Sequence, residues 1–188
     1  EVPYLMASFG DSRSLGEVSI TSPDFSVTSA FMRATRVPAL LMGKMGDVEY
    51  YRNYGVSGDL CANWNSTTRH ISGGGSGTAS ITNLCNETAL DFVVVQYGIN
   101  DVISWNGTSP VLATFVATQV ALHKAYITEI LKSGKKVVWE SINPCTFANY
   151  SSIAAKQTAV DQINAEVSAF IAGFPLWAVY ADTATYLK

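Results

Sequence analysis

Three short runs of glycine, serine, asparagine and aspartate each follow an apolar segment of the chain. They read FGDSRS around Ser12, NYGVSGD around Gly58 and YGIND around Asn100. A serine hydroxyl becomes a nucleophile when a base accepts its proton. The oxyanion formed by attack on a carbonyl needs neutral hydrogen-bond donors about 3 Å away. A glycine N–H and an asparagine amide are donors of this kind, so these residue types predict nucleophilic attack on a carbonyl carbon.

Each run also has an ordinary structural explanation. Ser12 or Asp11 could cap a following helix. Gly58 could be a turn glycine, and Asn100 could form an Asx turn. Ser14 is a rival nucleophile, but it does not directly follow Gly-Asp. Because all three runs occur in order after successive apolar segments, we favour one shared site and assign Asp11 a structural role in its loop.

Strand and helix patterns alternate along the chain, and they must position these runs. Apolar, β-branched segments predict strands at 3–9, 48–54, 90–97, 136–140 and 176–181. Helical patterns occupy 27–42, where Pro38 would bend or divide the helix, and also 110–133 and 151–172. This alternation predicts one three-layer α/β/α domain over residues 1–188, built around a parallel sheet of these five strands with right-handed crossovers.

The helix predicted at 110–133 carries the clearest terminal signals. Ser109 is a candidate N-cap with Pro110 at the first helical position, and Gly134 ends the helix. Its apolar stripe also includes His123, which is interpreted as a half-buried structural histidine. The other members of the stripe are Val116, Val120, Ile127 and Ile130.

Parallel sheets bind ligands beyond the carboxyl ends of their strands. The runs at Ser12, Gly58 and Asn100 follow the first, second and third predicted strands. We therefore expect these three residues to converge on one edge of the sheet. Two other catalytic patterns are absent from the sequence: the G-x-S-x-G elbow, and a phosphate loop, since SGGGSG at 72–77 lacks the Gly-Lys-Ser/Thr ending.

Together the three runs resemble the signature blocks of the SGNH hydrolase superfamily, also called the GDSL esterases and lipases. The resemblance covers nearly the whole chain, although Arg13 stands where a leucine usually follows the serine. It implies a flavodoxin-like order of the five parallel strands. It implies that Ser12 is the nucleophile. It also implies an oxyanion hole made by the N–H groups of Ser12 and Gly58 and the side-chain amide of Asn100. No metal and no organic cofactor is implied.

The family's last block, Asp-x-x-His, has no match in this chain. Residues 182–185 read DTAT, and the sequence ends at Lys188. We expect a domain truncated at its C-terminal end, whose Asp-x-x-His comes from a missing segment or a second chain. Two alternatives stay open: His70 is a substitute base, or the fold has lost catalysis and acts as a carbohydrate-binding or assembly module.

The resemblance does not define the substrate. Tyr54, Trp64 and Trp105 lie near the three runs, and the loops are rich in serine, threonine and asparagine. These residues favour an acetylated carbohydrate over a long acyl chain.

The composition is that of a globular protein, with 48% hydrophobic and 14% charged residues among 188. A net charge of −3 argues against a nucleic-acid partner, and no apolar run is long enough for a membrane span. Cys61, Cys85 and Cys145 form no C-x-x-C pair, so no zinc site is expected. Either buried free thiols or a Cys61–Cys85 disulfide fits the sequence. Sequons at Asn65, Asn86, Asn106 and Asn149 slightly favour an extracellular protein.

Overall fold

Five parallel strands form one sheet in the order β2-β1-β3-β4-β5. In this computed structural model the described residues are 4–10, 48–55, 60–61, 81–143 and 152–183. The strands are β1 (Tyr4–Gly10), β2 (Val48–Gly55), β3 (Phe92–Gln96), β4 (Lys136–Glu140) and β5 (Ala178–Ala181). The helices are α4 (Ile81–Asn86), α5 (Ile99–Ser104), α6 (Leu112–Lys132) and α7 (Ile153–Ile171). The helix expected at 27–42 lies outside the described residues.

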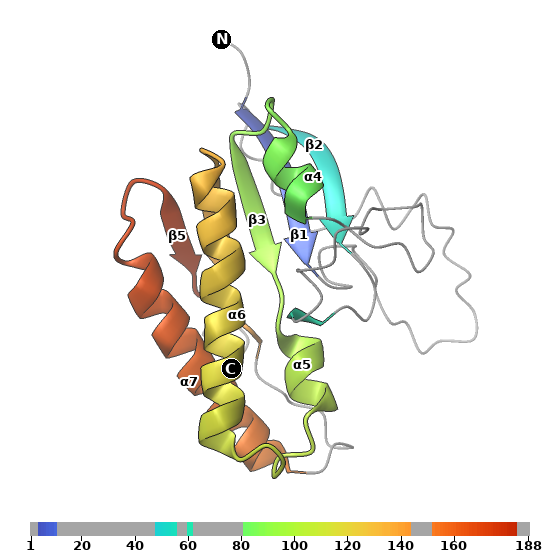
Figure 1. Cartoon of the computed structure of the whole chain (residues 1–188), viewed down its shortest axis with the longest axis vertical. Coiled ribbons are helices and arrows are strands. Elements are labelled where there is room, and N and C mark those ends of the chain that lie inside the picture. The colour runs from blue at the N-terminus through green and yellow to red at the C-terminus, as the bar shows by residue number, and fades with distance from the viewer. Residues whose placement is uncertain (1–3, 11–47, 56–59, 62–80, 144–151, 184–188) are drawn as a thin grey trace, which may run out of the picture.

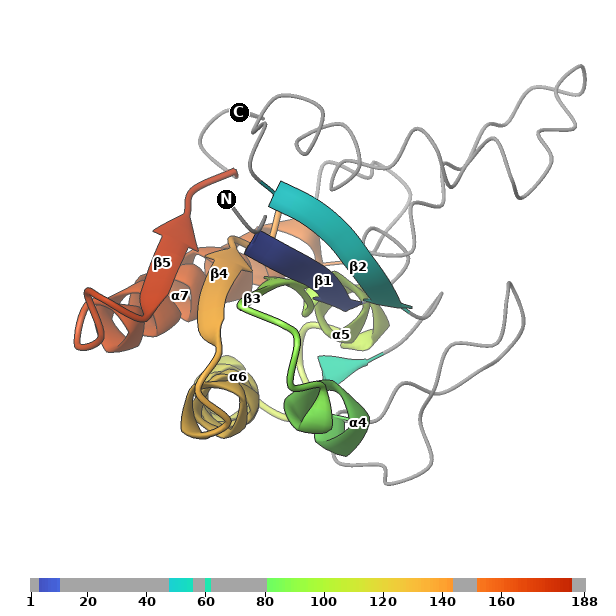
Figure 2. The same cartoon turned by 90° about the horizontal axis from the view of Figure 1, so that it is seen from above.

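This topology confirms the predicted flavodoxin-like sheet. The chain steps across the sheet in the same direction from β2 to β3, from β3 to β4 and from β4 to β5. Right-handed crossovers then put α4, α6 and α7, one from each connection, on one face. Figures 1 and 2 show α4, α6 and α7 together on that face, with α6 lying between α4 and α7.

The central strand β3 is covered on both of its faces. Val93 and Val95 are fully buried on the side of α6, while Val94 and Gln96 on the other side are each no more than 5% exposed. A near-continuous apolar run is typical of a parallel strand buried on both faces. The sequence-based interpretation of this strand is therefore confirmed.

Helix α6 presents its predicted stripe to the core, where Val116, Val120, Ile127 and Ile130 are all buried. His123 on the same stripe is 0% exposed, so the expectation of a half-buried histidine was wrong. Its ring packs edge-on against Tyr126 and Trp139, with centroids 5.2 Å apart in each case. The sequence pattern did not show that Trp139 of β4 would donate a hydrogen bond to His123. The burial of His123 was therefore underestimated.

The N-terminus of α6 also differs from the expectation. The helix begins at Leu112 after Val111, so Ser109 is not its N-cap. Instead, the Asn106 side-chain oxygen accepts hydrogen bonds from the N–H groups of Thr108 and Ser109, which organises a turn before the helix. Ser109 therefore contributes its N–H to the turn and does not cap the helix. Gly134 ends the helix as predicted, with φ of +80° and its N–H donating to the Leu131 carbonyl.

The sheet edge at β5 keeps large apolar side chains in contact with solvent. Leu176 is 81% exposed, Trp177 49% and Val179 56%. Within the described residues, none of the helices is both long enough and apolar enough to cross a membrane.

Candidate active site

The carboxyl edge of β1 and β3 is the structural centre of the candidate site. Gly10, the last residue of β1, pairs with Gln96, the last residue of β3. Since β2 and β3 flank β1 on opposite sides, the chain leaves β1 where the strand order reverses. Ligand sites of open parallel sheets lie at such points. Ser12 follows Gly10 by two positions, although it lies outside the described residues.

Asn100 lies in the first turn of α5, just beyond the end of β3 (Figure 1). It was expected in a loop, but only Tyr97 and Gly98 separate the strand from the helix. The side chain of Asn100 is partly exposed, which suits a group that meets a substrate. Placement on a helix gives its amide a better-defined position than a loop would.

Gly98 makes this short connection possible. Its φ of +106° lies in the region that favours glycine, and the residue stands at the N-cap position of α5. A Cβ added at Gly98 would lie 2.6 Å from Cδ1 of Ile142 and 3.1 Å from Nε2 of His123. Ile142 and His123 therefore lie closer to the Gly98 backbone than a residue with a Cβ atom would allow.

We predict that Gly98→Ala destabilises the fold by about 1–3 kcal/mol, because it adds backbone strain and a clash with buried Ile142. Gly134→Ala is the matched control, since its φ is +80° but a Cβ there would meet nothing within 4 Å. Urea unfolding measures both free energies. A loss at Gly98 no greater than that at Gly134 would contradict the proposed clash.

Two contacts hold the far end of α5 in place. The buried Lys156 of α7 donates from Nζ to the Ile103 carbonyl at 2.7 Å, where a cation also favours the helix C-terminus. Trp105 stacks on Phe115 with ring centroids 4.5 Å apart, and its Nε1–H donates to the Pro110 carbonyl at 2.9 Å. These contacts fix α5 against α6 and α7.

The same contacts correct one expectation about substrate binding. Trp105 is only 4% exposed and packs in the core, so it is not available to stack on a sugar. Sequence position near a motif did not show this, because the turn at Asn106 directs the chain back toward α6. Trp64 and the side chain of Tyr54 lie outside the described part of the structure.

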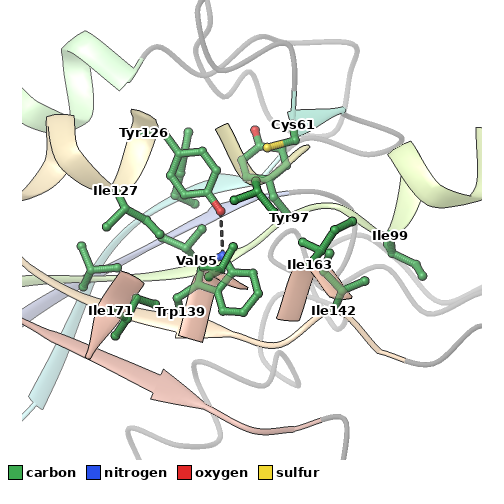
Figure 3. Packing of buried hydrophobic residues seen from close by; sticks show 14 of the residues in the cluster. Cys61, Val95, Tyr97, Ile99, Tyr126, Ile127, Trp139, Ile142, Ile163 and Ile171 are labelled. Carbon is green, nitrogen blue, oxygen red and sulfur yellow. Dashed lines mark hydrogen bonds between the residues drawn. The ribbon is translucent and has the colours of Figure 1, made fainter. Parts of the chain in front are cut away.

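Behind Gly98, a buried aromatic cluster joins α6 to β4. The Trp139 Nε1–H donates to the Tyr126 oxygen at 2.7 Å and to His123 Nδ1 at 3.1 Å, and Figure 3 shows the first of these bonds. Because an indole nitrogen only donates, Nδ1 must accept, which places the ring proton of His123 on Nε2. Burial raises the pKa of Tyr126 well above its ordinary value, so its O–H is retained and donates to the same Nδ1.

This arrangement assigns His123 a structural role. The ring is fully buried and its Nδ1 accepts from Tyr126 and Trp139. A general base must reach the proton that it accepts and exchange protons with the reacting groups. His70, the other histidine of the chain, lies outside the described residues, as do Gly58 and Ser12.

The structure also reveals polar groups at this edge to which the sequence assigned no role. The Gln96 amide donates to Glu140 between neighbouring strand ends, and Asn164 of α7 pairs with both backbone groups of Ile142 at 2.9 Å. Asp101, directly after Asn100, accepts a hydrogen bond from the Cys61 N–H at 2.8 Å. These contacts could not be predicted, because the sequence alone does not show which polar side chains are buried.

Cys61 and Cys85 do not form a disulfide in the structure. Of the two alternatives left open by the sequence, the structure therefore agrees with thiols. Burial raises the pKa of Cys85. Cys145 lies outside the described residues. No cluster of three histidine, cysteine, aspartate or glutamate side chains suited to a metal ion occurs in the part of the chain that was described.

Comparison with solved structures identifies the architecture. AlinE4, an esterase of the SGNH-hydrolase family, superposes with a TM-score of 0.58 at 14% identity over 94% of this chain and 75% of its own. A lipase/acylhydrolase from Enterococcus faecalis gives 0.57 at 18% identity, over 98% and 78% of the two chains. The chain has the SGNH-hydrolase fold. The three-layer architecture predicted from the sequence is therefore confirmed.

A third structural neighbour is a variant of Axe2, an acetyl-xylooligosaccharide esterase from Geobacillus, with a TM-score of 0.58. It is 16% identical over 98% of this chain and 78% of its own. At the level of sequence, no family profile and no curated protein matches this chain. At these identities the likeness establishes the fold. What the SGNH-fold chain does must be argued from its own residues.

Proposed function

We propose that this chain is a serine esterase that hydrolyses carboxylic esters. The observation that carries the proposal is the position of Asn100 on α5, beyond the carboxyl end of β3 and beside the strand that leads to Ser12. A partly exposed amide at this point is a neutral donor suited to an oxyanion. The SGNH fold and the FGDSRS run support the same assignment.

The proposed reaction proceeds through an acyl-serine. Ser12 Oγ attacks the ester carbonyl carbon while a histidine accepts the hydroxyl proton, and the carbonyl electron pair moves to oxygen. Asn100 and the N–H groups of Ser12 and Gly58 stabilise this oxyanion. Its collapse expels the alcohol, which takes the proton from the base. Water then attacks the acyl-serine by the same route and releases the carboxylic acid.

Two different histidines could act as the base in this proposal. One is His70; the other is a histidine of an Asp-x-x-His segment supplied by a second chain or by residues outside these 188. His123 is excluded by its burial in the aromatic cluster. His70→Ala separates the two answers, because it abolishes turnover only if His70 is the base.

We further propose that the substrates are acetyl esters, including those on carbohydrates. The polar loops of the chain and its likeness to an acetyl-xylooligosaccharide esterase support this preference, although Trp105 no longer does. We expect kcat/KM for p-nitrophenyl acetate to exceed that for the dodecanoate by about tenfold or more. Release of acetate from acetylated xylo-oligosaccharides checks the carbohydrate part. A preference for the dodecanoate would contradict the proposal.

The competing function is a binding or assembly module on the same fold. The observation that favours it is the full burial of His123, which prevents this histidine from serving Ser12 as a base. A module of this kind would bind acetylated carbohydrate without turnover, and replacing Ser12 would leave its properties unchanged. Ester hydrolysis that depends on Ser12 would exclude it.

A further inference from the structure

We propose that Lys156 is a positioning residue, which holds the helix that carries Asn100. The proposal rests on the proposed function, because it concerns the donor that the Asn100 amide supplies to the oxyanion. Lys156 lies in the first turn of α7 and is only 3% exposed. Its Nζ donates to the Ile103 carbonyl at 2.7 Å. Ile103 follows Asn100 by three positions in the same short helix, α5.

Helix α5 needs support from outside at its carboxyl end. It has six residues, whereas isolated helices of fewer than about 12 residues are marginal in water. The last carbonyl groups of a helix have no partner within the helix, and a basic side chain near that end can bind them. The last turn of α5 contains no basic residue. Lys156 therefore supplies from α7 both a donor and a positive charge that α5 itself lacks.

The position of Asn100 depends on this contact because α5 is so short. Three positions correspond to about 4.5 Å along the helix axis, so Asn100 lies within about one turn of the Ile103 carbonyl. The amino end of α5 is fixed by the close approach of Ile142 to Gly98. Release of the carboxyl end would therefore tilt the helix and move the Asn100 amide. Oxyanion donors act through preorganised geometry, and a displacement of about 1 Å can cost about 100-fold in rate.

The chain holds a second short helix in the same way, and this provides a matched control. Helix α4 also has six residues and no basic residue in its last turn. Lys135, which is 3% exposed, donates from Nζ to the Cys85 carbonyl of that turn at 2.8 Å. Lys135 directly precedes β4, so this contact lies at the amino edge of the sheet. Figure 1 shows α5 beyond the opposite, carboxyl end of β3.

A purely structural role is the alternative, because a buried carbonyl group needs a donor wherever it occurs. Loss of a structural contact lowers the number of folded molecules but leaves the turnover of each folded molecule unchanged. Loss of a positioning contact lowers the turnover of the folded molecules themselves. The two roles are therefore separated by kcat expressed per active site.

The experiment compares Lys156→Met with Lys135→Met in the full-length protein, purified together with any second chain that binds it. Methionine keeps a long apolar side chain but has neither the donor nor the charge. A fluorophosphonate that reacts to completion counts the active serines, so misfolded protein does not contribute to kcat. We expect Lys156→Met to lose about tenfold or more in kcat, with KM changed about threefold at most. Lys135→Met should leave kcat per active site unchanged.

Hydrogen exchange reads the state of α5 without catalysis. The N–H groups of Val102 and Trp105 form hydrogen bonds along this helix and at its end. Both should exchange faster in Lys156→Met, because the carboxyl end of α5 opens more often, and at the unaltered rate in Lys135→Met. In Lys135→Met, exchange should instead become faster in α4.

Unchanged exchange in α5 of Lys156→Met would overturn the positioning role. An equal loss of kcat in Lys135→Met would also overturn it, since the loss would then reflect general destabilisation. If the unaltered protein does not label at Ser12, the proposed function fails and Lys156 retains a structural role alone. If Ser12 is labelled but kcat is unaffected in Lys156→Met, the positioning role fails while the proposed function stands.

Discussion

Replacing Ser12 by alanine should reduce ester hydrolysis by about four to six orders of magnitude. The covalent pathway has no other nucleophile once the hydroxyl is removed, so the residual rate reflects only substrate binding and the oxyanion donors. Thermal unfolding should be nearly unchanged. Initial rates with p-nitrophenyl acetate, measured together with a melting curve, check both statements.

Ser14→Ala is the matched control, because Ser14 is the nearest other serine in the same run. It should keep most of the activity. If Ser14→Ala is inactive and Ser12→Ala is active, the nucleophile has been assigned to the wrong serine. If both variants behave as the unaltered protein does, the binding-module alternative becomes the better account of the fold.

Asn100→Ala is expected to lower kcat by about 100- to 1,000-fold, corresponding to about 2.7–4 kcal/mol of transition-state stabilisation. The amide donates mainly to the developing oxyanion, so KM for the ester should change much less than kcat. Asn100→Asp should be at least as damaging, because a carboxylate offers no N–H and repels the negative charge. Steady-state kinetics separates the two constants.

Asn86→Ala provides the control for this prediction, since Asn86 is an exposed asparagine at the end of α4. It should alter neither constant. A loss in Asn100→Ala confined to KM would show that Asn100 binds the ground state. The oxyanion role would then have to be withdrawn.

The sheet was predictable from the sequence because its strands are buried and their patterns are strong. The five predicted strands all occur, and the boundaries of β4 are the same as those predicted. The valines of β3 leave little alternative to a central parallel strand. The strand order was implied by the resemblance to the SGNH hydrolases, because right-handed crossovers fix the face on which each helix lies but not the order of the strands.

The two short helices were not predictable in the same way. Helices α4 and α5 have only six residues each, which is too few to establish a helical repeat in the sequence. Helix α5 depends on tertiary contacts, namely Lys156 at its last turn and the tight approach of Ile142 to Gly98. Asn100 was therefore assigned to a loop, although it lies on this helix.

Burial of polar and aromatic side chains was the other part that the sequence could not provide. Nothing near His123 in the chain indicates that Trp139 will meet it, since the two belong to different elements. Trp105 is close in sequence to the run around Asn100, so it was taken to favour a carbohydrate substrate. In the structure it stacks on Phe115 in the core. The hydrogen bond from the Cys61 N–H to Asp101 likewise joins residues 40 positions apart, so nothing in the neighbouring sequence indicates it.

The most direct test of the central claim is to react the full-length protein, purified together with any second chain that binds it, with a fluorophosphonate and to sequence the labelled peptide by mass spectrometry. Such a probe modifies a serine only where the hydroxyl is activated and the developing charge on the phosphorus-bound oxygen is stabilised. We predict a single adduct, located on Ser12 and slowed strongly in Asn100→Ala. A stable adduct on another serine, or no adduct at all on the folded protein, would contradict the assignment of Ser12 as the nucleophile.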